Sequence, residues 1–93
     1  MTFNYAIIDM THSTIVVEYE DEWDYEEYQY DENPYWHIYR EPNGLPVTEE
    51  LVEYVQENVQ GDLYTRETGA EILQLLTKRI EELGLSTVIT TGE

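Results

Sequence analysis

Hydrophobic and polar residues alternate along the first part of the chain, which is the pattern of β-strands. Residues 3–9 are rich in aromatic and β-branched side chains and predict a first strand, with a turn at residues 10–13. From Thr14 to about Tyr25 the odd positions are mostly apolar and the even positions are almost wholly acidic. A period of two predicts a strand with one face packed and the other face in water.

The alternation changes phase further along the chain. After Glu27 the aromatic residues move to even positions, Tyr28 and Tyr30, which predicts a bulge or a turn at that point. Residues 31–34 (DENP) predict a turn. Residues 35–41 (YWHIYRE) predict a further strand, and the Pro-Asn-Gly sequence after it predicts another turn.

The second half of the chain has helical periodicity. Thr48 is the expected N-cap of a first helix that ends at Gly61, because acids follow it in the first turn. Thr65 is the expected cap of a second helix over residues 66–83, which Gly84 stops. The residues expected to face inward are Leu51, Val52, Val55, Val59, Ile72, Leu73, Leu76, Ile80 and Leu83.

Residues 85–91 (LSTVITT) are β-prone and predict a possible last strand at the sheet edge. The elements together predict an α+β fold, an antiparallel β-sheet of three or four strands with two helices packed on one face. The chain has 93 residues, with no internal repeat and no long linker, so we expect a single domain over residues 1–93.

Charge narrows the possible functions. The chain has 21 Asp and Glu against 4 Lys and Arg, a formal net charge of −17. Such a charge works against direct binding to nucleic acid or to an anionic membrane, and it favours a basic protein surface as partner. The absence of cysteine excludes disulfides and thiolate metal sites. We expect neither a signal peptide nor a membrane span, since the N-terminus and the apolar runs fit neither pattern.

The acids concentrate between Glu18 and Glu32, where nine Asp and Glu interleave with aromatic residues and no Lys or Arg intervenes. Like charges on one sheet face are destabilising, so an uncompensated run indicates a use. The expected partner-binding residues are Glu18, Glu20, Asp21, Glu22, Trp23, Asp24, Tyr25, Glu26, Glu27, Tyr28, Tyr30, Asp31 and Glu32. Among the aromatic residues, Tyr28 and Tyr30 are the better candidates for contact. The alternative is a solvated face that keeps the protein soluble and its sheet edge unpaired.

A second acidic stripe is expected on the first helix, where Glu49, Glu53 and Glu57 share one face, with Glu50 beside them. It is either a plain solvent-exposed face or, if it lies beside the acidic strand, part of one continuous patch.

The sequence gives little support for a metal site or a catalytic site. No window has the glycine of an EF-hand loop, and two histidines are too few for a usual zinc site. His12 and Ser13 are adjacent, which does not make a nucleophile and base. We therefore expect no enzyme, no catalytic residue, no metal and no cofactor.

Segments of this sequence resemble two classes of small phage protein. The length, the composition and the segment EYEDEWDYEEYQYDENPYW resemble small phage-encoded inhibitors that mimic nucleic acid, of the anti-CRISPR, anti-restriction and glycosylase-inhibitor kinds. This resemblance implies binding to the nucleic-acid groove of a host enzyme. The segments NYAIIDMTHSTIVVEYEDE and NGLPVTEELVEYV resemble small phage proteins of the virion or tail.

Two functions are therefore expected. The first is a non-enzymatic inhibitor in the host cell cytoplasm, whose carboxylate surface mimics DNA and occupies the basic groove of a defence protein. The alternative is a virion or tail accessory protein that uses the acidic aromatic segment for subunit contacts. The chain is expected to be a monomer or a small homo-oligomer in either case.

Overall fold

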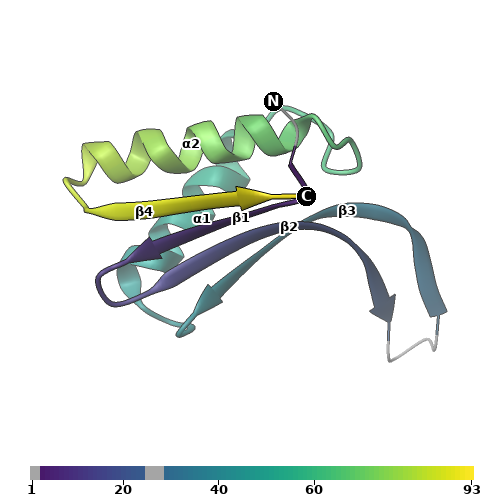
Figure 1. The fold of residues 1–93 in the computed structure, drawn as a ribbon, viewed down its shortest axis with the longest axis horizontal. Coiled ribbons are helices and arrows are strands. Elements are labelled where there is room, and N and C mark those ends of the chain that lie inside the picture. The colour runs from purple at the N-terminus through teal and green to yellow at the C-terminus, as the bar shows by residue number, and fades with distance from the viewer. Residues whose placement is uncertain (1–2, 25–28) are drawn as a thin grey trace.

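The protein is an α+β fold, as the sequence predicts. The computed structural model describes the backbone of residues 3–24 and 29–93 and the side chains of residues 3–21 and 33–93. The elements in chain order are β1 (Tyr5–Met10), β2 (Thr14–Asp24), β3 (Gln29–Glu41), α1 (Pro46–Asn58), α2 (Thr68–Glu82) and β4 (Thr87–Gly92). The strands form one antiparallel sheet in the order β3-β2-β1-β4 (Figure 1). The predicted last strand is confirmed, and it pairs with β1 at the sheet edge.

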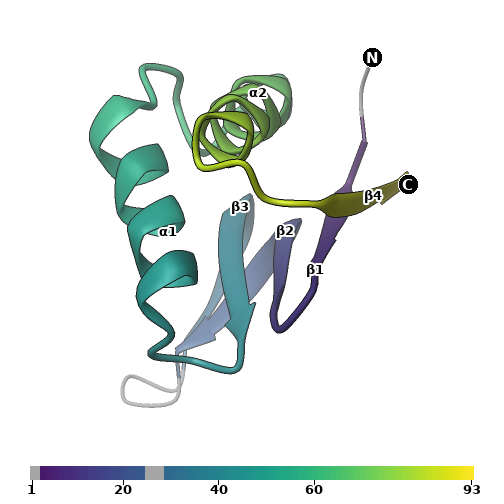
Figure 2. The same ribbon diagram turned by 90° about the vertical axis from the view of Figure 1, so that its left-hand side faces the viewer.

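Both helices lie on the same side of the sheet (Figure 2). The core lies between the two layers. Ala6 and Ile8 of β1 pair with Val17 and Ile15 of β2, and all four side chains are fully buried. The apolar odd face of β2 is therefore the packed face, as predicted. The buried side chains that the helices contribute are Leu51, Val52, Val55, Ile72, Leu76 and Ile80. The prediction for Leu83 is wrong, since this residue follows the end of α2 and is 37% exposed.

The other side of the sheet is covered by no helix or strand of the described chain, and we call it the open face. Cross-strand partners share a face of an antiparallel sheet, and successive residues alternate between faces. The described side chains at open-face positions are therefore Tyr5, Ile7, Asp9, Thr14, Val16, Glu18, Glu20, Tyr35, His37, Tyr39, Glu41, Val88 and Thr90.

The predicted turn at residues 31–34 is wrong, because β3 continues through this segment. Glu20 pairs with Tyr35 and Glu22 pairs with Asp31, so one residue on β2 opposes three on β3. The turn-like sequence therefore marks an irregularity within a strand. Pro34 is tolerated there because β3 is an edge strand, where a missing N–H need not break the ladder.

The predicted boundaries of the first helix are also wrong. The helix begins at Pro46 with Leu45 as N-cap residue, and Thr48 is a buried residue of the first turn whose hydroxyl donates to the Leu45 carbonyl. Proline suits the first helical position because the N–H that it lacks would have no intrahelical partner. The helix ends at Asn58, before Gly61.

The second helix begins at Thr68 rather than just after Thr65. The segment before it forms hydrogen bonds three residues apart, from the Thr65 N–H to Asp62 and from the Thr68 N–H to Thr65. Contacts with β3, described below, hold this segment in a turn. Gly84 stops the helix as predicted, with a φ of 69° that favours glycine.

Candidate functional site

The strands β2 and β3 continue beyond the rest of the sheet. β1 pairs with β2 only as far as Glu18, whereas the pairing of β2 with β3 continues to Asp24 and Gln29. We call residues 19–24 of β2 and 29–36 of β3 the acidic ribbon. Figure 1 shows the two strands extending past β1 and β4 and curving away from the helices. The acidic ribbon is thus a two-stranded projection from a four-stranded sheet.

The acidic ribbon contains much of the negative charge of the chain. Its two strand segments have six Asp and Glu and no Lys or Arg. The register brings positions from both strands together, because Glu22 lies opposite Asp31 and Trp23 lies opposite Tyr30. The two consecutive strands therefore bring acidic positions together, and like charges at opposed positions destabilise a sheet.

The structure places part of the predicted site. Glu18 and Glu20 lie on the open face of β2, and Asp21 follows at the irregularity. The predicted residues at strand positions whose side chains lie outside the described set are Glu22, Trp23, Asp24, Tyr30, Asp31 and Glu32. Tyr25, Glu26, Glu27 and Tyr28 lie outside the described residues, as does the predicted change of phase.

Trp36 fixes the base of the acidic ribbon. Its backbone N–H donates to the Leu63 carbonyl at 3.0 Å, and its indole Nε1 donates to the Thr65 carbonyl at 3.1 Å. The indole is 3% exposed and packs edge-on against the Phe3 ring, with the ring centroids 5.4 Å apart. A lone two-stranded hairpin is marginally stable in water, so this attachment to the core holds the base of the projection in place.

Tyr19 makes a second attachment from the other strand. Its ring lies 5.1 Å from the Trp36 ring, and its hydroxyl donates to the Tyr64 carbonyl at 2.8 Å. The backbone N–H of Tyr19 donates to the carbonyl of Asn4. The loop before α2 therefore accepts hydrogen bonds from both strands where the acidic ribbon leaves the sheet.

A row of rings continues the candidate surface onto the open face. Tyr35, His37 and Tyr39 alternate along β3, with ring centroids 4.0 Å apart for the first pair and 5.9 Å for the second. The Tyr39 hydroxyl donates to the carboxylate of Glu20, and His37 Nε2 lies 3.0 Å from the Glu20 carbonyl oxygen. These contacts orient Glu20 and the rings on one face.

The sequence-based site did not include this row. The sequence does indicate such a row, because Tyr35, His37 and Tyr39 occupy alternate positions of a predicted strand. The missing information was the pairing of β2 with β3, which sets His37 opposite Glu18 and Tyr35 opposite Glu20. A one-residue slip in that register would have put the rings on the packed face.

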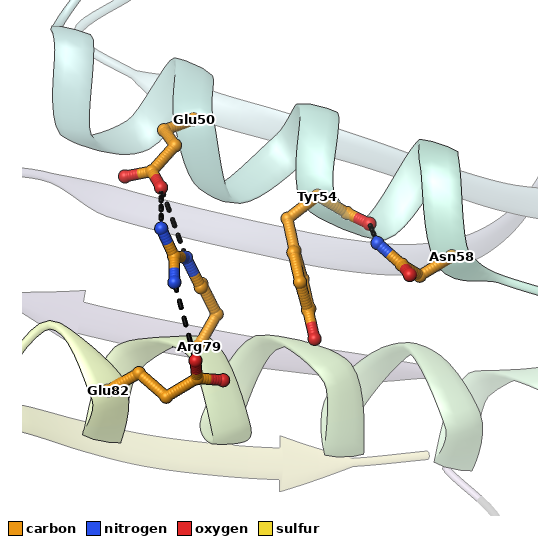
Figure 3. A network of polar contacts seen from close by, with 5 residues as sticks. All are labelled: Glu50, Tyr54, Asn58, Arg79 and Glu82. Carbon is orange, nitrogen blue, oxygen red and sulfur yellow. Dashed lines mark hydrogen bonds and ion pairs between the residues drawn. The ribbon is translucent and has the colours of Figure 1, made fainter.

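The acidic stripe of α1 does not join the candidate surface, because the helices lie across the sheet from the open face (Figure 2). Its first acids have cationic partners. Glu49 accepts from Arg40 Nε at 2.6 Å, and Glu50 accepts from Arg79 of α2. Arg79 also contacts Glu82 at 3.4 Å and lies 5.7 Å from the centroid of the Tyr54 ring (Figure 3). These acids join elements of the fold to one another.

The electrostatic setting of Glu49 follows from these contacts. Its side chain accepts hydrogen bonds from Arg40 and from the Gly44 N–H, and Gly44 has a φ of 83° in the turn before α1. The hydrogen bond from Arg40, then that from Gly44, lowers the pKa of the Glu49 carboxyl below its ordinary value. The hydrogen bond that Arg79 donates to Glu50 raises the pKa of the Arg79 guanidinium above its ordinary value. Glu49 thus stabilises the tertiary fold in its charged form.

Other parts of the described chain bear on metal binding, on small-molecule binding and on membrane insertion. No group of three His, Cys, Asp or Glu residues among the described ones is arranged to hold a metal ion. His12 is exposed in the turn after β1 and lines a mainly apolar hollow of about 270 Å³ together with Leu45, Pro46 and Leu85. Among the described helices, none has both the length and the apolar character that a membrane span needs.

The geometry therefore defines one distinctive surface, the acidic ribbon with the adjoining ring row. Comparison of the chain with protein-family models, with curated proteins and with solved structures found no match.

Proposed function

We propose that this chain is a non-enzymatic binding protein that presents the acidic ribbon to a basic groove of a nucleic-acid-binding protein. In this proposal it inhibits a defence protein of the anti-CRISPR or anti-restriction target kind, in the cytoplasm of a phage host. The observation that carries the proposal is a two-stranded projection with six acids, no Lys or Arg, and a base fixed by Trp36.

The spacing of charge supports mimicry of a nucleic acid. Alternate residues on a strand are about 6.6–6.8 Å apart on one face. Phosphates along one strand of duplex DNA rise by about 3.4 Å each, so alternate acids are about two phosphate steps apart. The second strand of the ribbon supplies acids at a lateral distance of about 5 Å. A groove lined with Arg and Lys would therefore meet acidic positions whose spacing is comparable to that of phosphates.

Attachment at the base supports tight binding. A surface that is ordered before association loses less conformational entropy when it binds. Trp36 and Tyr19 hold both strands to the loop before α2, so the start of the projection is positioned in the free protein. The ring row adds broad amphipathic side chains beside the charges, and aromatic residues of this kind are enriched at interfaces.

A competition experiment tests the proposal. Labelled duplex DNA is bound to a restriction or CRISPR nuclease of a candidate host, and the purified chain is titrated in while the release of DNA is followed by fluorescence anisotropy. We expect displacement at one chain per DNA site, with an affinity that falls steeply as salt rises. Displacement that does not change from low to high salt would contradict the electrostatic mechanism.

Matched variants identify the surface. The triple variant Glu20→Gln, Glu22→Gln, Asp24→Asn neutralises three acids on the ribbon, and Glu53→Gln, Glu57→Gln, Glu81→Gln neutralises three exposed acids on the helices. We expect the ribbon variant to lose about tenfold or more in affinity, or about 1.4 kcal/mol, and the helix variant to lose much less. Equal losses would mean that net charge alone, and not the ribbon, determines binding.

One observation favours the alternative of a virion accessory protein. β4 is an uncharged edge strand whose outer side is open, and such an edge can pair with a strand of a neighbouring subunit. Mass spectrometry of purified phage particles separates the two functions. Detection of the chain at a fixed copy number per particle would support the virion function and would contradict a free inhibitor.

A further inference from the structure

The two edge strands of the sheet, β3 and β4, differ in how well they are protected from pairing with another strand. On β3, an irregularity with Pro34 interrupts the strand, two acids precede this proline within the strand, and the outward N–H of Trp36 donates to the Leu63 carbonyl. These are features by which proteins prevent edge-to-edge pairing. β4 has none of them. Its six residues, TVITTG, include no charged residue and no proline, and its register with β1 is regular from Thr87 to Gly92.

The register shows which backbone groups of β4 face outward. The Met10 N–H donates to the Ser13 carbonyl, so even-numbered residues of β1 bond to β2. Asn4, just before β1, contacts both neighbouring strands, because its carbonyl accepts from the Tyr19 N–H and its N–H donates to the Gly92 carbonyl. Odd-numbered residues of β1 then bond to β4, because neighbouring residues of an antiparallel strand point their N–H and C=O to opposite sides. Their partners on β4 are Val88, Thr90 and Gly92.

It follows that Thr87, Ile89 and Thr91 direct their N–H and C=O groups away from the sheet. No hydrogen bond among the described residues joins these outward groups to another part of the chain. The side chains beside them are accessible too, since Val88 is 67% exposed and Ile89 is 38% exposed. The edge therefore offers a regular set of donors and acceptors with apolar side chains alongside.

The distribution of charge indicates what can pair there. The strand itself has no acid to attract a basic partner, whereas the acidic ribbon lies toward the opposite edge in the order β3-β2-β1-β4. Two copies that meet at β4 therefore keep their ribbons far apart, at the two ends of the joined sheet. Beyond the Debye length of about 8 Å at physiological salt, the repulsion between the ribbons is largely screened.

The residues whose backbone groups point outward are Thr87, Ile89 and Thr91, and they are arranged symmetrically about Ile89. We propose that β4 of a second copy pairs with β4 of the first in antiparallel register, about a two-fold axis at Ile89. Ile89 then faces Ile89 of the second copy, and Thr87 faces Thr91 of the second copy. Each copy donates and accepts three backbone hydrogen bonds. The product is a dimer with one continuous eight-stranded sheet and an acidic ribbon at each end.

The register of this dimer gives a charge test. In Thr87→Lys, Thr91→Lys, each new cation faces a second cation across the two-fold axis. In Thr87→Lys, Thr91→Glu, each faces an anion instead, at the same two positions. Both positions are on the rim of the fold, where Thr91 is exposed and Thr87 is half-buried. Circular dichroism of both variants at low concentration confirms that they are folded before their association is compared.

Sedimentation equilibrium at physiological salt measures the association from about 1 μM to about 1 mM, the range of weak to moderate affinity. We expect the wild-type chain to dimerise, the Lys/Lys variant to be monomeric, and the Lys/Glu variant to dimerise. A wild-type chain that is monomeric throughout overturns the proposal. So does equal association of the two variants, or growth beyond dimers. The ribbon variant Glu20→Gln, Glu22→Gln, Asp24→Asn is expected to dimerise as the wild type does, so this inference is independent of the proposed function.

Discussion

The indole of Trp36 lies against the backbone of Gly69 in the first turn of α2. A Cβ atom added at Gly69 would overlap the six-membered ring of the indole, so only glycine allows helix and strand to approach this closely. The contact joins the base of the acidic ribbon to the helix layer. It also explains a glycine near the start of a helix, a place where its backbone freedom is otherwise a disadvantage.

The variant Gly69→Ala should therefore be destabilised. Overpacking of this kind costs about 1–3 kcal/mol, which exceeds the gain of up to about 1 kcal/mol from the better helix propensity of alanine. Urea denaturation measures the free energy of unfolding. In a Trp36→Phe background the smaller ring relieves the overlap, so the same substitution should cost less. An equal cost in both backgrounds would show that the indole is not the cause.

The hydroxyl of Tyr19 should contribute to the attachment of the ribbon. Tyr19→Phe removes the donor to the Tyr64 carbonyl and should cost about 0.5–1.5 kcal/mol, the usual net contribution of such a bond. Hydrogen exchange should become faster for the amides of β2 and β3 near this point. Tyr64→Phe is the control, because Tyr64 supplies only its backbone carbonyl to this bond, and it should leave the exchange rates unchanged.

The contribution of Glu49 should depend on pH. Its folded-state pKa is lowered, mainly by the hydrogen bond from Arg40, so the charged carboxylate stabilises the fold above its unfolded-state pKa. That contribution is lost as the pH falls through the lowered folded-state value. The stability difference between the wild type and Glu49→Gln should therefore shrink in acid. NMR titration of the Glu49 carboxyl should show its pKa rising in Arg40→Met. No change there would refute the assigned cause.

Neutralising the acidic ribbon should stabilise the protein while it weakens binding. The chain has a net charge of −17, and repulsion between like charges destabilises a compact state. Glu20→Gln, Glu22→Gln, Asp24→Asn should raise the melting temperature at low salt, and the gain should diminish as salt screens the wild-type charges. A variant that melts at a lower temperature would mean that these acids make stabilising contacts in the folded state.

Local patterns in the sequence predicted most of the elements. The alternation over Thr14 to Tyr25 predicted β2 and its packed face, and the β-prone residues 85–91 predicted β4. Helix and strand boundaries were less accurate where tertiary contacts decide them. Thr65 is a plausible helix cap by itself, but its carbonyl accepts from the Trp36 indole, and α2 starts later. A partner 29 residues away leaves no signal in a local window.

The sequence by itself determined the composition of the surface. It showed one acidic, tyrosine-rich segment without Lys or Arg, and this follows from the order of residues alone. Only the tertiary structure decided where that segment lies and which residues are beside it. Strand pairing set Glu22 opposite Asp31 and His37 opposite Glu18, and it left β4 as an uncharged edge far from the ribbon. Cross-strand neighbours depend on register and strand order, which are set by packing of the whole core and not by any single segment.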